Sequence, residues 1–178
     1  MTQLPAFIAE LVSAPKNLPF RPTWDERSDP YYLTFHVPLI SEHRAIGGFE
    51  LRAKVSKRFI DSDAIFQLEY APAGSKAIGL SRCCWRPKNT HTNKSWGPPG
   101  YEFARFVKAS HQHLFEDNWL PQGQRMRNGN LPGARPISPD LSTLSDFIAF
   151  CGECFKINNI DLIDIPVRTA DLFWTSDG

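Results

Sequence analysis

The stretch FELRAKVSKRF, residues 49–59, decides the fold class of this chain. Apolar and polar residues alternate along it, with Phe49, Leu51, Ala53, Val55 and Phe59 on one side and Glu50, Arg52, Lys54, Ser56 and Arg58 on the other. Successive side chains of a strand project to opposite faces, so a period of two predicts a strand with one buried and one exposed face. Strands of this kind are typical of antiparallel sheets that are covered on one side.

The segments on both sides of this stretch repeat the alternation. Apolar residues recur at every second position in residues 33–39 and 66–70, and Ile78, Leu80 and Cys84 continue the alternation in residues 78–85. Turn residues separate the segments: Gly47-Gly48, Asp61-Ser62-Asp63 and Pro72-Ala73-Gly74-Ser75. Four successive strands joined by short turns predict a β-meander.

Helical spacing is clear near the two ends of the chain, whereas residues 101–115 fit either a helix or a strand. Ser138-Pro139-Asp140 has the cap, the proline and the acidic residue that favour a helix start. An apolar stripe with helical spacing follows: Leu141, Leu144, Phe147, Ile148, Cys151, Cys154 and Phe155. Residues 4–13 predict a short N-terminal helix with Phe7, Ile8, Leu11 and Val12 on one face, and the tail IDLIDIPV (160–167) could add a strand.

The fold class expected is therefore α+β: an antiparallel sheet of four to six strands, with an amphipathic C-terminal helix over 139–156 on one face and a short N-terminal helix. The 178 residues predict a single domain, 1–178, with a core at about 31–165 and long loops at 86–100 and 121–137. Hydrophobic residues make up 42% of the chain, enough for a packed core. No apolar run is long enough for a membrane span and no secretory signal is recognisable, so we expect a cytoplasmic protein without membrane contact.

Charge is distributed unevenly along the chain. The net charge is +1, but residues 82–135 carry +6 and residues 136–178 carry −5. A basic middle favours an anionic partner, nucleic acid first, although the middle and the tail could also neutralise each other in the fold.

Three histidines are candidate catalytic residues. His111 and His113 would project from the same face of a strand, and His91 could join them if the loop 86–100 folds back. A histidine pair beside Arg and Lys could cleave RNA as general acid and base, with Arg86 or Lys88 stabilising the charge on the phosphorane. The same three histidines could instead hold a transition metal, or lie on a solvated strand without a role.

Candidate residues for binding nucleic acid or a partner protein surround these histidines. Aromatic side chains among cations can stack on bases while the cations contact phosphates. The set is Arg86, Lys88, Asn93, Lys94, Trp96, Arg105, Lys108, Arg125, Arg127 and Arg135. The arginines of residues 121–137 could equally bind an acidic protein surface.

The cysteines and the common motifs add little. Cys151 and Cys154 form C-x-x-C within the apolar stripe, where packing is the simplest role, and adjacent Cys83 and Cys84 are poor partners for a four-sulfur zinc site. Phosphate-binding loops, dinucleotide fingerprints and H-E-x-x-H are missing, so no cofactor is expected.

The order of the motifs carries a resemblance. Strands are followed by His91-Thr92-Asn93, then His111-Gln112-His113, then LFEDNWLP (114–121) and LSTLSDFIAFCGECFKI (141–157). Over about residues 33–157 this resembles a family of small uncharacterised bacterial proteins carried by phages or mobile elements, and is similar in order to TumE-type toxins of toxin–antitoxin pairs. The chain departs from that pattern by long insertions between His91 and His111 and between Trp119 and Ser138.

The resemblance implies a toxin-like or mobile-element accessory protein. The leading hypothesis is that its basic, His-containing surface engages RNA and cleaves it by acid–base chemistry, with an antitoxin-like protein as a further partner. A non-enzymatic phage-encoded anti-defence inhibitor that binds a host protein complex is the alternative, and a His-ligated metal-dependent hydrolase is the second alternative.

Overall fold

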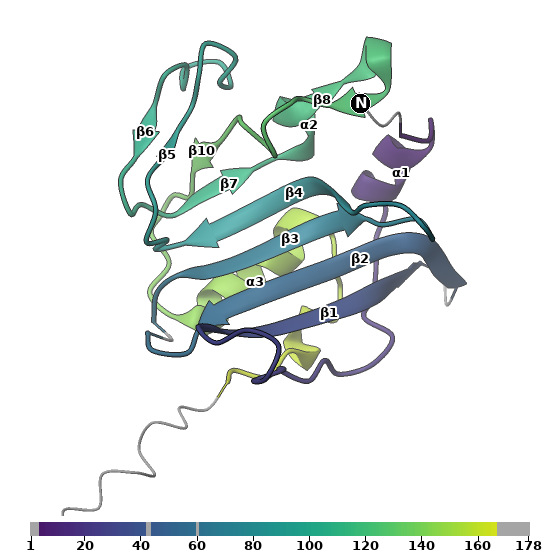
Figure 1. Ribbon diagram of the computed structural model, residues 1–178, viewed down its shortest axis with the longest axis vertical. Helices are drawn as coiled ribbons and strands as arrows, with labels where there is room; N and C mark the ends of the chain where they lie inside the picture. Colours follow the sequence, from purple (N-terminus) through teal and green to yellow (C-terminus); the bar gives the residue numbers. More distant parts are fainter. Residues whose placement is uncertain (1–3, 42–43, 60, 167–178) are drawn as a thin grey trace, which may run out of the picture.

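A six-stranded antiparallel sheet forms the centre of the molecule, as a computed structural model shows (Figure 1). The structure describes residues 4–41, 44–59 and 61–166. The strands lie in the order β1-β2-β3-β4-β7-β10. Their bounds are β1 (Tyr32–Ser41), β2 (Arg44–Ser56), β3 (Ala64–Tyr70), β4 (Ile78–Trp85), β7 (His111–His113) and β10 (Arg135–Pro136).

Short elements surround the sheet. Two small hairpins pair β5 (His91–Thr92) with β6 (Arg105–Phe106) and β8 (Trp119–Leu120) with β9 (Arg125–Met126). The helices are α1 (Ile8–Ser13), α2 (Phe115–Asn118) and α3 (Leu144–Phe155), with 3-10 turns η1 (Pro121–Gly123) and η2 (Ile160–Leu162). The α+β class, the C-terminal helix on one face and the short N-terminal helix are confirmed.

The predicted meander is confirmed, with one turn in the wrong place. Strands β1 to β4 pair consecutively. Gly47 and Gly48 lie inside β2, because this strand extends back to Arg44 and continues the pairing with β1. A pair of glycines permits a turn but does not require one when a neighbouring strand offers hydrogen-bond partners.

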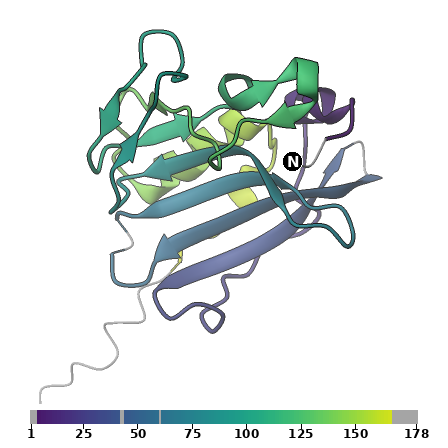
Figure 2. The ribbon, with the colours of Figure 1, turned by 45° about the horizontal axis from the view of Figure 1, so that its top comes forward.

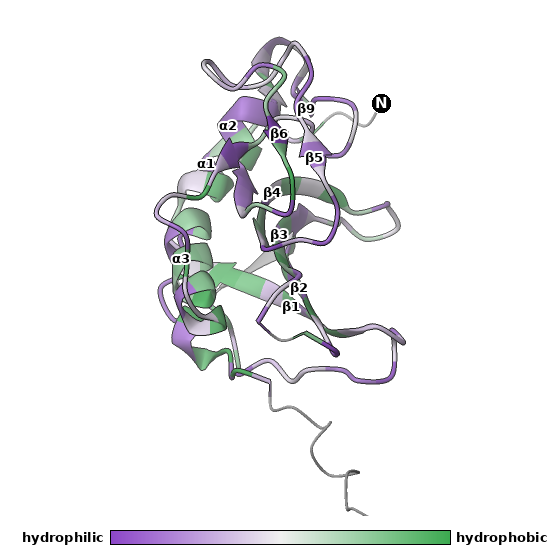
Figure 3. Cartoon of the chain, turned by 90° about the vertical axis from the view of Figure 1, so that its left-hand side faces the viewer, coloured by the Kyte–Doolittle hydropathy of each residue, from purple (hydrophilic) through white to green (hydrophobic). Residues whose placement is uncertain are grey.

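Helix α3 covers one face of the sheet and closes the main core (Figures 1 and 3). The alternating apolar residues of β1 to β4 point toward it, and Phe66, Trp85 and Phe147 are fully buried between the two layers. The ring of Phe147 makes an edge contact with Phe66 at 5.5 Å and stacks on Trp85 at 5.9 Å, measured between ring centroids. Aromatic packing therefore fixes the helix on the sheet.

The predicted start of the C-terminal helix was wrong. The helix begins at Leu144, with Thr143 as its N-cap. The Thr143 hydroxyl accepts a hydrogen bond from the Asp146 amide, and the Asp146 carboxylate accepts one from the Thr143 amide. This reciprocal capping box satisfies two backbone donors, whereas Ser138 lies six residues before the helix.

Both ends of the chain also differ from expectation. Phe7 precedes α1 and is exposed, so it does not share the buried side of Ile8. The described part of the tail forms the 3-10 turn η2 and no strand, while Val167 lies outside the described residues. Across the described ranges, no helix combines the length and apolar character that a membrane crossing requires.

The loop 86–100 folds back over the sheet, on the side away from α3. It contributes β5, whose pairing with β6 makes a hairpin, residues 91–106, beside β7 and β10 (Figures 1 and 2). Contact between the rings of His91 and His111 fixes this hairpin against β7. Residues far apart in the sequence therefore meet at the β7 end of this face.

Candidate functional site

The three predicted histidines come together in one cluster. His111 and His113 project from the same side of β7, and His91 reaches them from β5. The ring centroid of His91 lies 5.2 Å from that of His111 and 4.7 Å from that of His113. The His111 and His113 centroids are 5.1 Å apart. The condition under which His91 could join the pair, that the loop 86–100 folds back, is therefore met.

The cluster is buried. His111 is 3% exposed and His113 is 2% exposed, while His91 is half-buried and Phe106 stacks on His111 at 5.3 Å. Burial lowers the pKa of His111 to about 4 and lowers the pKa of His113 well below its ordinary value, and the charge of Arg82 acts in the same direction. Burial also lowers the pKa of His91. All three imidazoles are therefore neutral at pH 7.

Hydrogen bonds set the orientation of each ring. His111 Nδ1 donates to the Ala109 carbonyl at 2.8 Å, and His113 Nδ1 donates to the Gly133 carbonyl at 3.2 Å. His91 Nε2 faces two oxygens, Asn93 Oδ1 at 2.9 Å and the Pro132 carbonyl at 3.2 Å. A neutral ring that donates through one nitrogen keeps its lone pair on the other. The lone pair consequently lies on Nε2 of His111 and His113 and on Nδ1 of His91.

Strand β4 adds two residues that sequence reasoning did not place in the site. In the ladder, Cys84 pairs with His111 and Arg82 pairs with His113. Residues that face each other across a ladder project to the same side of the sheet. Cys84, His111 and His113 have ligating atoms within 4.8 Å of one another, and all three are buried. The alternation of Ile78, Leu80 and Cys84 predicted Cys84 on the buried face, and this was wrong. A register shift between β3 and β4 at Leu68/Glu69 changes the phase of β4, so Cys83 and Trp85 join the core under α3 and Cys84 faces the other side.

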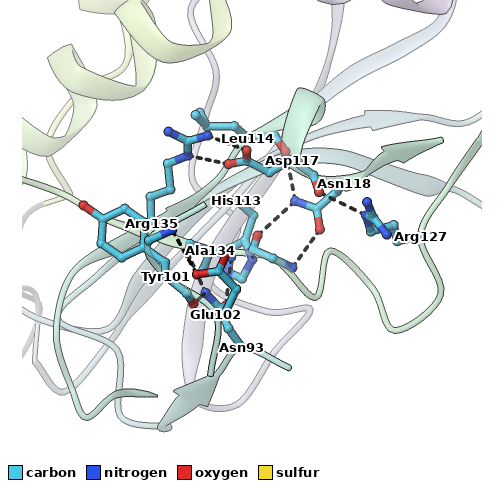
Figure 4. A network of polar contacts seen from close by, with 12 residues as sticks. Asn93, Tyr101, Glu102, His113, Leu114, Asp117, Asn118, Arg127, Ala134 and Arg135 are labelled. Carbon is cyan, nitrogen blue, oxygen red and sulfur yellow. Dashed lines mark hydrogen bonds and ion pairs between the residues drawn. The ribbon is translucent and has the colours of Figure 1, made fainter. Parts of the chain in front are cut away.

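Two asparagines fasten the segment 132–134 over the cluster (Figure 4). Asn93 Oδ1 accepts from the Ala134 amide, and its Nδ2 donates to the carbonyls of Tyr101 and Ala134. Asn118 Oδ1 accepts from the Gly133 amide, and its Nδ2 donates to the carbonyls of Gly133 and Leu114. Asn93 was a predicted binding residue, yet it is buried and acts inside the fold. Asn118 was not predicted.

Three of the predicted binding cations are held by carboxylates. Arg135 makes two hydrogen bonds to Asp117, of 2.7 and 2.6 Å. Lys88 Nζ lies 3.4 Å from Asp63, and Arg86 lies 3.5 Å from Asp140. Carboxylates thus neutralise part of the basic middle at Arg86, Lys88 and Arg135, but the predicted pairing of the middle with the acidic tail is seen in these three pairs only at Arg86. Only the Asp140 carboxylate belongs to the acidic tail.

The remaining predicted cations divide into two groups. Lys94, Arg105 and Lys108 are exposed on or beside the β5–β6 hairpin. Arg125 and Arg127 line a groove of about 700 Å³ together with Arg52 and Lys76, and Glu69 is also part of its wall. Arg127 Nε additionally donates to the Asp117 carbonyl at 3.2 Å.

The hairpin also displays aromatic rings. Trp96 is 41% exposed and Phe103 is 69% exposed, and Lys94 Nζ lies 5.4 Å from the centre of the Trp96 ring. Phe103 has a backbone φ of 58° and Lys108 one of 53°, values in the left-handed region that large side chains rarely adopt. For Phe103 a turn accounts for this conformation: the Ala104 amide donates to the Tyr101 carbonyl at 3.1 Å, and Phe103 is the third residue of the turn 101–104.

The other cysteines pack in the core. Cys83 and Cys151 are fully buried, and Cys154 Sγ lies 3.7 Å from Gln112 Oε1. Burial raises the pKa of Cys83 and Cys151 and keeps them as thiols. Cys151 and Cys154 thus lie where the predicted packing role places them.

Comparisons with models of protein families, with curated proteins and with solved structures found no match. The resemblance to mobile-element proteins and TumE-type toxins therefore stays a prediction.

Proposed function

We propose that the chain binds single-stranded RNA through the β5–β6 hairpin, with Trp96 and Phe103 as stacking rings. The observation that carries this proposal is the exposure of both rings among the cations Lys94, Arg105 and Lys108. Aromatic rings stack on bases of any sequence, and neighbouring cations contact the phosphates. Glu102 also lies on the hairpin, and its carboxylate accepts a hydrogen bond from the Gly100 amide.

The state of the histidines favours binding without cleavage. A general acid must be protonated at the working pH and must reach the scissile phosphate. His111 and His113 are buried and neutral at pH 7. Phe106 and the segment 132–134 cover both histidines and keep them inside the fold. We therefore assign the contact with RNA to the hairpin.

The test is a fluorescence anisotropy titration of a labelled single-stranded RNA with wild-type protein and with the double variant Trp96→Ala/Phe103→Ala. Each ring is expected to contribute roughly 1–3 kcal/mol, so the double variant should bind at least about tenfold more weakly. Phe20→Ala removes a comparably exposed ring outside the hairpin and should bind like the wild type. Equal binding by the double variant would contradict the proposal, as would the lack of RNA binding by the wild type.

The dependence of binding on salt gives an independent measure of the cations. Contacts with phosphates of a single strand lower log K by roughly 0.7 per contact for each tenfold rise in salt. Lys108→Ala should lower this slope by about one contact. Lys57→Ala, a lysine that donates to the carbonyls of Glu26 and Asp29 away from the hairpin, is the matched control and should leave it unchanged.

A second candidate function, docking on an acidic protein partner, is favoured by the groove of Arg52, Lys76, Arg125 and Arg127. Electrostatic complementarity with such a partner would speed association and make it sensitive to salt. The charge reversal Arg125→Glu should then abolish stoichiometric binding of a host complex while RNA binding persists. The opposite pattern would assign the function to the hairpin.

A further inference from the structure

Three potential metal ligands meet between β4 and β7, on the face opposite α3. Cys84 and His111 are direct partners in the ladder, and His113 projects to the same side two residues later. Their ligating atoms lie within 4.8 Å of one another. The donors of a tetrahedral zinc site are separated by about 3.3–3.8 Å, given metal–ligand bonds of about 2.0–2.3 Å. Small side-chain rotations would therefore bring the three atoms onto one ion.

The two strand histidines already have the hydrogen-bond pattern of metal ligands. In metal sites, a coordinating histidine usually donates its other ring N–H to a carbonyl or a carboxylate. His111 and His113 each donate Nδ1–H to a backbone carbonyl, those of Ala109 and Gly133. Their lone pairs are left on Nε2, so no change of tautomer is needed for coordination.

His91 is the candidate for the fourth ligand, although it lies outside the group of three whose ligating atoms are within 4.8 Å of one another, so its ring would have to move closer. Its ring lies 4.7 Å from His113 and 5.2 Å from His111, centroid to centroid. Its Nε2 donates to Asn93 Oδ1, and this leaves the Nδ1 lone pair for an ion. Asn93 has the orientation to act as acceptor because its Nδ2 is engaged by two carbonyls.

We propose that Cys84, His91, His111 and His113 bind one zinc-class divalent cation, which ties the β5–β6 hairpin to the sheet. One thiolate and three imidazoles form a donor set of borderline softness that suits Zn²⁺ and Co²⁺ and disfavours Mg²⁺ and Ca²⁺. Coordination replaces the Cys84 S–H bond by a metal–sulfur bond and releases one proton to solvent. Structural zinc sites are closed and four-coordinate, in agreement with the burial of this one. The proposal does not depend on RNA binding.

The positive charge of Arg82 lies beside the site and disfavours the binding of a cation there. It pairs with His113 across the ladder, and its Nη2 donates to the Asn130 carbonyl at 2.7 Å. The thiolate of Cys84 offsets one of the two charges of the metal. The ion and its ligands together then carry a single positive charge beside Arg82.

The experiment is a titration of the full chain, first freed of metal with a chelator, with Co²⁺ followed by absorption spectroscopy. We expect one ion per chain, the visible bands of tetrahedral Co²⁺ and a near-ultraviolet band for charge transfer from sulfur to cobalt. Added Zn²⁺ should displace Co²⁺ and abolish both sets of bands.

Cys84→Ser should remove the charge-transfer band and weaken binding at least about a hundredfold. Cys154→Ser is the control, because it changes a half-buried cysteine of α3, on the other side of the sheet, whose Sγ contacts Gln112. His113→Ala should weaken binding similarly, and circular dichroism of the metal-free variants confirms that they are folded. A Zn²⁺-dependent rise in melting temperature should be present in wild type and Cys154→Ser and missing in Cys84→Ser.

Two results would overturn the proposal. One is wild-type protein that binds no Co²⁺ at micromolar concentration. The other is a charge-transfer band that persists in Cys84→Ser, which would locate the ion on another cysteine.

Discussion

The two faces of the sheet are covered in different ways. On the α3 side, aromatic and aliphatic side chains such as Phe66, Trp85 and Phe147 fill the space. On the opposite side, at β4 and β7, the buried groups include imidazoles, a thiol and the amides of Asn93 and Asn118 beside the apolar Phe106, Leu131 and Ala134. Apolar contacts give stability without direction, whereas each polar group needs a partner in a defined position. One side therefore holds the fold together, and the other holds a defined arrangement of polar atoms and an exposed hairpin.

The largest effect is expected from Phe147→Ala on the α3 side. Removing a fully buried aromatic ring leaves a cavity, so the free energy of unfolding should fall by about 3–5 kcal/mol. Phe150→Ala, half-buried on the same helix, should cost under about 2 kcal/mol. Urea unfolding followed by circular dichroism measures both, and equal losses would contradict the placement of the core.

The matching change on the opposite side is Asn93→Ala. It leaves the backbone groups of Ala134 and the carbonyl of Tyr101 without their side-chain partner, and we expect a loss of about 1–3 kcal/mol. The loss should appear as faster hydrogen exchange of the Ala134 amide. The exposed Asn128→Ala is the control. An unchanged rate of hydrogen exchange at Ala134 in Asn93→Ala would contradict the role of Asn93 in holding the segment 132–134.

A buried cation near the α3 side provides a pH test. Lys16 Nζ donates to the carbonyls of Leu11, Val12 and Ala14. Burial, and then the charge of Lys156, lowers the pKa of Lys16 to about 8. Between pH 8 and 10.5 the unfolded chain therefore binds more protons at this group than the folded chain, so stability rises with pH.

The expected rise is about 1–2 kcal/mol between pH 7.5 and 9.5, measured by urea unfolding. Lys16→Met removes the titrating group and should abolish this contribution. If the stability of the wild type fell over the same pH range, with the same slope in Lys16→Met, the predicted contribution of Lys16 would be excluded.

The smallest effect is expected at the start of α3. Thr143→Ala removes the capping hydroxyl and should lower the free energy of unfolding by about 0.5–2 kcal/mol. Ser142→Ala, the exposed preceding residue, should have little effect. If Ser142→Ala were the more damaging change, the cap would be assigned to the wrong residue.

The sequence predicted what periodicity encodes. Alternation over five or more residues located β1 to β4, and the stripe from Leu144 to Phe155 located most of α3. Strands β5, β6 and β10 have two residues each, too few for any period to be visible. The helix start was misplaced because a cap depends on the side chain three residues later, and Asp146 favours Thr143 over Ser138.

The site was predicted in part for the same reason. H-x-H spacing placed His111 and His113 on one side of a strand, but only the register of β4 against β7 adds Cys84 to them. Burial of the cluster could not be inferred, because it depends on the 132–134 segment that Asn93 and Asn118 hold in place. Local spacing thus identified the chemical groups, and long-range pairing determined their surroundings.

The most direct test of the division between the two sides is an NMR titration of ¹⁵N-labelled protein with single-stranded RNA, observed at the tryptophan indole N–H groups. The indoles of Trp24 and Trp85 donate to the carbonyls of Asp164 and Leu141 and serve as internal references. We predict that the Trp96 indole signal shifts strongly while the signal of Trp85 stays in place. A stationary Trp96 signal under conditions where RNA is bound, or a larger shift at Trp85, would contradict the assignment of the binding surface to the hairpin.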